Sequence, residues 1–427
     1  MTLARQASAS DGKSGSGRLG SWLHWLPTHA KYYAIECFVF LFLINLPLYL
    51  YLTGIWNVRP QLLFLVALLF VPFARIPRRS TFALLPFAGW NMLFLLTVAA
   101  SALMNSDSNG AVPGTARYLG GVVVCFLALA IGAALPERRL LRTVCFATAV
   151  TSLICLFDLI FPFALPKSDD EFIIFGRGAG LYIQPNGAGM AISLGFLVSH
   201  SVVDKRWFYP FFFICIVGLL ATVSRGALLC FVPTLFLVRF PRVRSSTAVI
   251  LVLAIMLLVR MATTSYDSWS EFQDSADLWL GILGGRSSGI EGDILGQSGL
   301  DRIAAAAKAW EVFSDSPWLG AGVGYTRSWD LADPPHNMYL TFAAEFGGIV
   351  GISLLALYFL SVYYSISDPR LKYNARLVLL FLALFFLFTH NHFDDYVAQL
   401  IVGTLVGTSL RFASHWDIPR TRSVSEA

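Results

Sequence analysis

Long apolar runs alternate with short polar segments along most of the chain. The runs are apolar on every face, which is typical of helices that cross a membrane and not of the strands of a spanning barrel. Because a perpendicular span needs about 20 residues, the shorter runs predict thin or irregular helices. The twelve runs lie near residues 33–53, 60–74, 82–103, 116–135, 140–165, 187–203, 207–222, 225–240, 246–262, 337–363, 374–392 and 395–412.

The composition excludes a soluble protein. Hydrophobic residues make up 56% of the chain and charged residues 13%, whereas a soluble domain carries roughly 25% charged residues. The sequence therefore predicts an all-α membrane protein with about twelve transmembrane helices. All six cysteines lie inside apolar runs, which excludes a disulfide framework and a thiolate zinc site. Prolines inside the runs predict kinks at Pro47, Pro72, Pro86, Pro162 and Pro233.

The basic residues predict the orientation of the chain. With the N-terminus in the cytoplasm and the runs alternating in direction, 21 of the 31 Lys and Arg residues fall inside and 10 outside. We therefore expect an even number of spans and two cytoplasmic termini. The net charge of +5 fits these basic loops and does not indicate nucleic-acid binding. The predicted parts are a tail at 1–32, nine spans in 33–262, an external loop at 263–335, three spans in 336–412 and a tail at 413–427.

The external loop between the ninth and tenth predicted spans is much longer than an ordinary connection. Connections beyond about 15 residues are usually functional or disordered. This loop contains five tryptophans, which need a folded surface to pack against. Residues 300–313 predict a helix, and the polar segment 314–317 ends it. We expect a large folded loop that covers one end of the helical bundle.

Three of the arginines on the predicted outer side are candidates for a binding site. Arg225 lies in a very short hairpin, Arg177 lies in a glycine-rich segment, and Arg302 lies on the predicted loop helix. Most basic residues near helix ends only reach into the interface or the solvent. The alternative is a diphosphate site, because guanidinium groups match phosphate oxygens bidentately and stay charged.

His336 follows two prolines where the long loop re-enters the membrane, and Asn337 comes next. A histidine at a helix N-terminus tends to be neutral, and a neutral imidazole accepts a proton. The alternative is an interfacial histidine that bonds to a backbone carbonyl. Glu345 lies inside the following apolar run, where a carboxylate is costly and therefore functional or paired.

A second polar group ends the eleventh run and contains His390, His392, Asp394 and Asp395. Its spacing matches no strong metal-ligand pattern, so we interpret it as a polar turn between two helices. The sequence has no Gly-Lys-Ser phosphate loop, dinucleotide glycine fingerprint or His-Glu-x-x-His pair. Any chemistry is therefore expected on the outer side, away from ATP and nucleotide sugars.

The region from about residue 170 to 360 resembles the O-antigen ligase and polysaccharide polymerase family of bacterial inner-membrane proteins. The order and spacing of its motifs fit the family, whereas the first five spans match only in hydropathy. The blocks are Gly176-Arg177, Gln184-Pro185-Asn186, Ser224-Arg225-Gly226, Asp301-Arg302, residues 310–313, residues 316–324, His336-Asn337 with Tyr339-Leu340, and residues 345–351.

The resemblance implies a multi-pass enzyme of the bacterial inner membrane with a periplasmic active site. Members move a glycan from undecaprenyl diphosphate to an acceptor glycan without a metal or nucleotide cofactor. Lipid A-core is the acceptor in ligases, and a second lipid-linked repeat unit is the acceptor in polymerases. Carried over by motif, His336 is the catalytic residue. Arg225, Arg302 and Arg177 bind the diphosphate, and Asn337 and Glu345 are supporting residues.

A single displacement suits these residues. Arginines stabilise the diphosphate leaving group, and His336 takes the proton from the acceptor hydroxyl, so the anomeric centre inverts. A retaining enzyme needs a carboxylate nucleophile, and the sequence offers no clear candidate for one, with only Glu345 left open. The alternatives are a repeat-unit polymerase for O-antigen or exopolysaccharide and a lipid-linked glycan transporter. The latter would show internal repeats and midplane charges, and we find no convincing repeat. The sugar, its linkage, the acceptor and the oligomeric state stay open.

Overall fold

A computed structural model describes residues 17–74, 76, 81–105, 110–161, 164–166, 177–237, 296–329 and 334–412. The predicted run at 246–262, most of the external loop, Pro162 and the tail at 413–427 lie outside these residues. The described part is helical, with no strand in it. Its elements are α1 (Gly17–Leu43), α2 (Leu46–Leu52), α3 (Pro60–Phe64), η1 (Leu65–Phe73), α4 (Thr81–Met104), α5 (Ala111–Ala134), α6 (Glu137–Ile160), η4 (Gly180–Tyr182), α7 (Pro185–Ser199), η5 (His200–Val202), α8 (Lys205–Thr222), α9 (Arg225–Leu237), α12 (Gly296–Asp315), α13 (Tyr325–Ser328), α14 (Met338–Phe346), α15 (Gly348–Ser365), α16 (Pro369–Phe385) and α17 (Tyr396–Phe412).

Five of the described helices are long and apolar enough to cross a membrane: α4, α5, α6, α8 and α15. A sixth candidate is the pair of α1 and α2, which is bent by 52° at a short break. Several other helices are shorter than a span, as the short apolar runs predicted. The all-helical class is confirmed, and the chain is a multi-pass membrane protein, while the count of twelve spans and the side on which the loop lies stay predictions.

The break between α1 and α2 lies at Asn45, two residues before the predicted kink at Pro47. Asn45 has a left-handed backbone with φ of 66°, which asparagine tolerates better than most residues. Its Nδ2 donates to the Leu181 carbonyl at 2.9 Å, and its Oδ1 accepts from the Tyr396 hydroxyl. The asparagine thus fixes the bend by joining it to two distant segments of the chain.

Helices α5 and α17 pack closely because glycines let their backbones touch. A Cβ at Gly403 would overlap the Cys125 carbonyl oxygen, and a Cβ at Gly407 would overlap the Leu129 carbonyl oxygen. The two glycines are four residues apart, the spacing that brings small residues to one face of a helix. Since Gly403 faces Cys125 and Gly407 faces Leu129, the two helices run in the same direction.

Two neighbouring glycines of α5 provide a test of this packing. A Cβ at Gly121 would overlap the Phe393 carbonyl oxygen, whereas a Cβ at Gly120 meets nothing within 4 Å. We expect Gly121→Ala to lower the free energy of unfolding by about 1–3 kcal/mol, the usual cost of an overfilled core. Gly120→Ala should be neutral or stabilising by up to about 1 kcal/mol, because alanine favours helix. Melting temperatures in detergent measure both, and equal values for the two variants would contradict this packing.

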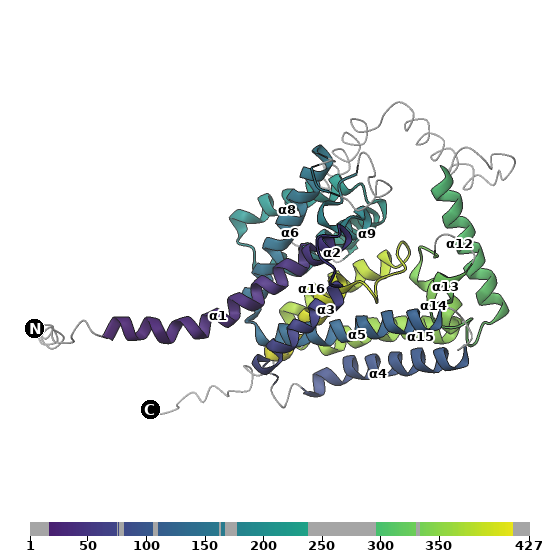
Figure 1. Cartoon of the computed structure of the whole chain (residues 1–427), viewed down its shortest axis with the longest axis horizontal. Helices are drawn as coiled ribbons and strands as arrows, with labels where there is room; N and C mark the ends of the chain where they lie inside the picture. Colours follow the sequence, from purple (N-terminus) through teal and green to yellow (C-terminus); the bar gives the residue numbers. More distant parts are fainter. Residues whose placement is uncertain are drawn as a thin grey trace, which may run out of the picture.

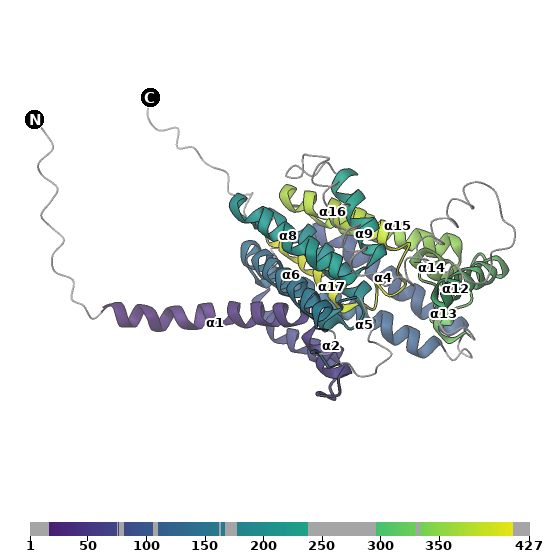
Figure 2. The ribbon, with the colours of Figure 1, turned by 90° about the horizontal axis from the view of Figure 1, so that it is seen from above.

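Helices α12, α13 and α14 gather at one end of the bundle, opposite to the end from which α1 begins (Figures 1 and 2). Helix α12 lies crosswise over the ends of α4, α5 and α15 rather than along them. It confirms the helix predicted at 300–313 and extends it at both ends. Gly347, with φ of 81°, divides the predicted tenth run into α14 and α15. We refer to this end of the bundle as the α12 end.

Candidate functional site

His336 lies directly before α14 and is half-buried. The next residue, Asn337, caps the helix, because its Oδ1 accepts a hydrogen bond from the Leu340 backbone N–H at 3.1 Å. The Met338 N–H donates to the Phe386 carbonyl at 2.8 Å, which holds the start of α14 against the connection between α16 and α17. Asn337 therefore supports the position of His336 through the backbone.

The connection at residues 386–395 brings a second histidine to His336. The rings of His336 and His390 meet edge to face with their centroids 4.9 Å apart. At the end of the same segment, Asp395 accepts from the Val397 and Ala398 N–H groups at 2.9 and 3.0 Å and so begins α17. The interpretation of this segment as a polar helix–helix turn is thus confirmed at Asp395. Sequence reasoning did not place His390 beside His336.

Two arginines that sequence reasoning did not select surround these histidines. Arg327 of α13 forms an ion pair with Asp394, with 2.9 Å between Nη2 and Oδ2. Burial, followed by the charges of Arg327, His336 and Arg117, lowers the pKa of His390 to about 3. Two arginines thus contribute positive charge near His390, and Asp394 pairs with one of them. The signal in the sequence was the small group of basic residues on the predicted outer side, which includes both arginines.

Arg177 lies where α7, α8 and α9 meet. Its Nε donates to the Thr222 carbonyl at 3.2 Å, and its Nη2 donates to Asn186 Oδ1 at 3.0 Å. The same Asn186 oxygen accepts from the Ser224 hydroxyl at 3.1 Å. The Gln-Pro-Asn and Ser-Arg-Gly motifs are therefore joined through one asparagine, and Arg177 is held in place by both.

Arg225 is the first residue of α9, and its exposed side chain makes no hydrogen bond or ion pair among the described residues. A Cβ at the next residue, Gly226, would lie 2.9 Å from Phe388 Cβ. Since Phe388 belongs to the 386–395 connection, the start of α9 and the start of α14 pack against the same segment. Arg177, Arg225 and His336 thus lie at one end of the bundle. We call these three residues with the 386–395 connection the candidate site.

Arg302 and Glu345 stand apart from the candidate site in different ways. Arg302 is exposed on α12, and no contact among the described residues joins it to Arg225 or His336. Glu345 is 1% exposed, and its two carboxylate oxygens accept from the Tyr118 hydroxyl at 2.9 Å and the Thr326 hydroxyl at 2.6 Å. Glu345 therefore ties α14 to α5 and α13, and it is not placed to attack a sugar.

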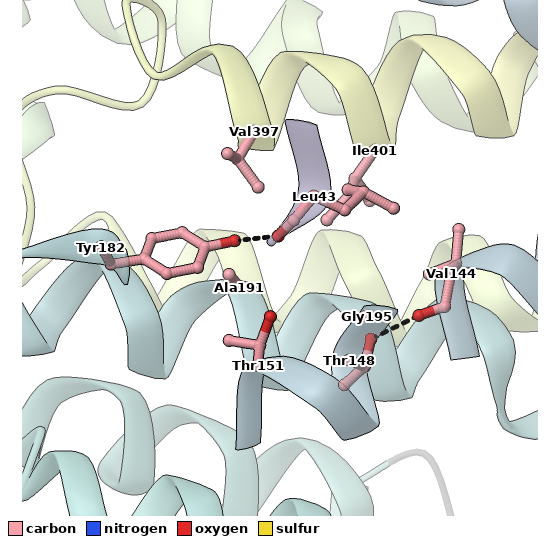
Figure 3. Close-up of a pocket in the computed structure, with 9 residues that line it drawn as sticks. All are labelled: Leu43, Val144, Thr148, Thr151, Tyr182, Ala191, Gly195, Val397 and Ile401. Carbon is pink, nitrogen blue, oxygen red and sulfur yellow. Dashed lines mark hydrogen bonds between the residues drawn. The ribbon is translucent and has the colours of Figure 1, made fainter. Parts of the chain in front are cut away.

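A small cavity lies between α1, α6, α7 and α17 (Figure 3). The Tyr182 hydroxyl donates to the Leu43 carbonyl at its edge, and Thr148 donates to the Val144 carbonyl at 2.8 Å. The cavity volume is about 10 Å³, which is room for roughly one water molecule. The cavity is too small for a sugar. In the described part of the chain, no three His, Cys, Asp or Glu side chains gather closely enough to hold a metal ion.

The depressed pKa of His390 predicts how acid acts on the fold. An unfolded imidazole takes up a proton as the pH falls below about 6.5, whereas the folded His390, with a pKa of about 3, stays neutral. Because only the unfolded state takes up this proton, His390 leaves the free energy of unfolding unchanged above about pH 6.5 and lowers it as the pH falls further. On moving from about pH 7.5 to about pH 5, we expect His390→Gln to lose less stability than wild type, by on the order of 1 kcal/mol.

Melting temperatures of both proteins at the two pH values measure this difference. Asp395, whose pKa burial raises to about 6, titrates in the same range. It is present in both proteins, so its contribution cancels in the comparison. Equal acid sensitivity of wild type and His390→Gln would contradict the buried, neutral state of this ring.

The comparisons with known proteins match part of the chain that contains most of the candidate residues. Residues 210–356 match the family model described as O-Antigen ligase, and this stretch includes Arg225, Arg302, His336 and Glu345. No curated protein matches the chain. The resemblance inferred from the motifs is confirmed over the matched stretch. Over residues 210–356, the chain is therefore similar to the O-antigen ligase family, which supports a ligase- or polymerase-type glycan transferase.

Proposed function

We propose that the protein moves a glycan from undecaprenyl diphosphate to an acceptor glycan, such as lipid A-core, at the periplasmic face of the bacterial inner membrane. One observation carries the proposal. Arg177, Arg225 and His336 lie at the same end of a membrane bundle, part of which matches the O-antigen ligase family model. Basic side chains and an imidazole are the groups that a transfer with a diphosphate leaving group needs.

Arg225 and Arg177 have different tasks in this proposal. Arg225 is exposed and projects from the start of α9, so its guanidinium binds the donor diphosphate with two parallel hydrogen bonds. Arg177 is already bound to Asn186 and the Thr222 carbonyl, so it shapes the segment that carries Arg225 and adds positive potential. Fixed cations of this kind stabilise the charge that grows on the diphosphate as its bond to the sugar breaks.

His336 acts as the general base. The acceptor hydroxyl oxygen forms a bond to the anomeric carbon while the bond from that carbon to the diphosphate oxygen breaks. The electron pair of the broken bond stays with the diphosphate, and the hydroxyl proton passes to an imidazole nitrogen of His336. A direct displacement inverts the anomeric centre. Because both oxygens of Glu345 are engaged by Tyr118 and Thr326, a retaining route through this carboxylate is disfavoured.

A deletion strain tests the proposal and separates the two activities of the family. We expect loss of glycan from lipid A-core with accumulation of lipid-linked polymer, and restoration by the wild-type gene but not by an Arg225→Ala gene. Accumulation of single lipid-linked repeat units would assign a repeat-unit polymerase instead. Unchanged surface polysaccharide and unchanged lipid-linked intermediates in the deletion strain would overturn the proposed function.

A further inference from the structure

Helix α12 carries an apolar stripe on the side that does not pack against the bundle. Its buried face consists of Ala305, Ala309 and Val312, and the last two pack with Ala344 of α14. A different face exposes Ile303 and Trp310, which are 55% and 60% exposed. They are seven residues apart, two helical turns, so they lie on one side of the helix. Apolar side chains that gather on one exposed side are typical of a surface that meets a membrane or another protein.

The stripe continues onto the segment that follows α12. Trp318 and Leu319 are 66% and 56% exposed. This segment is fixed to the start of α15, because the Gly348 N–H donates to the Pro317 carbonyl at 2.8 Å. On the first turns of α15, Ile349 and Ile352 are exposed as well. Exposed apolar side chains thus lie on a candidate membrane span, on the segment that leads to it, and on α12.

Two contacts show on which side of α12 the stripe lies. Phe313 sits against the start of α15, since a Cβ at Gly348 would lie 2.5 Å from its ring. Trp310 meets the Phe313 ring at a centroid distance of 5.3 Å. Trp310 therefore lies on the α15 side of the helix. The opposite flank is polar and carries the ion pair of Lys308 and Glu311, with 3.2 Å between Nζ and Oε2.

We infer that α12 docks on the lipid surface of the membrane, with Ile303, Trp310, Trp318 and Leu319 inserted at the headgroup level. Helix α12 lies crosswise at the end of the spans, the direction of a helix in the plane of the membrane surface (Figures 1 and 2). Tryptophan is enriched at this depth because its ring is apolar and its N–H is polar. An amphipathic helix with one aromatic face and one charged face is the kind that binds lipid surfaces.

Docking would give Arg302 a place in the reaction, a consequence that rests on the proposed function. Arg302 precedes Ile303 and has no contact with the candidate site among the described residues. On a docked helix its guanidinium stands at the level of lipid phosphates, where the donor diphosphate also lies. Arg302→Ala should then lower turnover without unfolding the protein. The position of the helix is measured separately from any activity.

Fluorescent labels on the two flanks of α12 test the docking. In a Cys37→Ser background, an environment-sensitive fluorophore is attached to Ile303→Cys or to Glu311→Cys of the full-length protein in lipid vesicles. A second set of vesicles contains brominated lipids, which quench fluorophores inside the membrane. Iodide quenches fluorophores that are exposed to water. We expect the label at 303 to be quenched by the brominated lipids and protected from iodide. The label at 311 should show the reverse.

Two results would overturn the docking. Equal iodide quenching at both positions would place the whole helix in water. Protection at 303 that brominated lipids do not quench would mean that protein, either a second copy or another segment, covers the stripe. Since neither readout depends on turnover, an inactive protein with the expected quenching would count against the proposed function and leave the docking in place.

Discussion

The His336→Ala variant should lose about 10²–10⁴-fold in turnover, which is the usual contribution of a positioned proton acceptor. His336 is half-buried beside His390 at the start of α14, and the proposed chemistry needs one imidazole to take the acceptor proton. Donor binding should change little, because the arginines hold the diphosphate. Initial rates with a lipid-linked donor, together with donor binding measured separately, give the two quantities.

His336→Gln distinguishes a base from a positioning group. Glutamine keeps a hydrogen-bonding side chain but cannot take up the proton, so its turnover should fall nearly as far as that of His336→Ala. The acidic limb of the pH–rate profile, which a titrating imidazole base produces, should disappear. A glutamine variant that turns over within a few-fold of wild type, with the acidic limb unchanged, would remove His336 from the base role.

Arg225→Ala should lower turnover on the order of 10²–10³-fold, the loss seen when a preorganised group that stabilises transition-state charge is removed. Arg225→Lys should recover only part of the activity, since lysine keeps the charge but not the bidentate geometry. Arg225 makes no hydrogen bond or ion pair among the described residues, so the melting temperature should not fall. Turnover and melting curves of the purified variants measure both effects.

Arg206→Ala is the matched control for Arg225→Ala. Arg206 is also exposed, and it lies in the first turn of α8, at the opposite end of that helix from the Thr222-to-Arg225 hairpin. Its removal changes the net charge by the same amount but should leave turnover unchanged. Equal losses in the two variants would indicate a general charge effect, and full activity of Arg225→Ala would remove Arg225 from the site.

The helical class was predictable because apolar runs without alternation leave a membrane chain few choices. The loop helix was predictable as well, since the polar residues 314–317 end it and α12 stops at Asp315. Asn337 and Asp395 are each the first residue of an apolar run, and both cap helices in the structure. These features follow from local chemistry, which a single sequence displays.

The contacts between distant segments were not predictable in the same way. His390 lies 54 positions after His336, and their proximity depends on the Phe386 carbonyl that binds the start of α14. A carboxylate in an apolar run is costly, so the sequence indicated that Glu345 is functional or paired, but it did not indicate the partners. Tyr118 and Thr326 satisfy it from two other helices. The ion pair of Arg327 and Asp394 joins α13 to the 386–395 connection, and neither residue's place in the sequence indicates that the two side chains meet.

Transfer by the purified protein tests the central claim most directly. The wild-type protein and the His336→Ala variant are each reconstituted in vesicles with a glycan on undecaprenyl diphosphate, and either lipid A-core or a second lipid-linked repeat unit is added. We predict that wild type joins the glycan to one of these acceptors, inverts the anomeric linkage and releases one undecaprenyl diphosphate per glycan. His336→Ala should leave the donor intact. A folded wild-type protein that leaves the donor intact with both acceptors would contradict the proposed function.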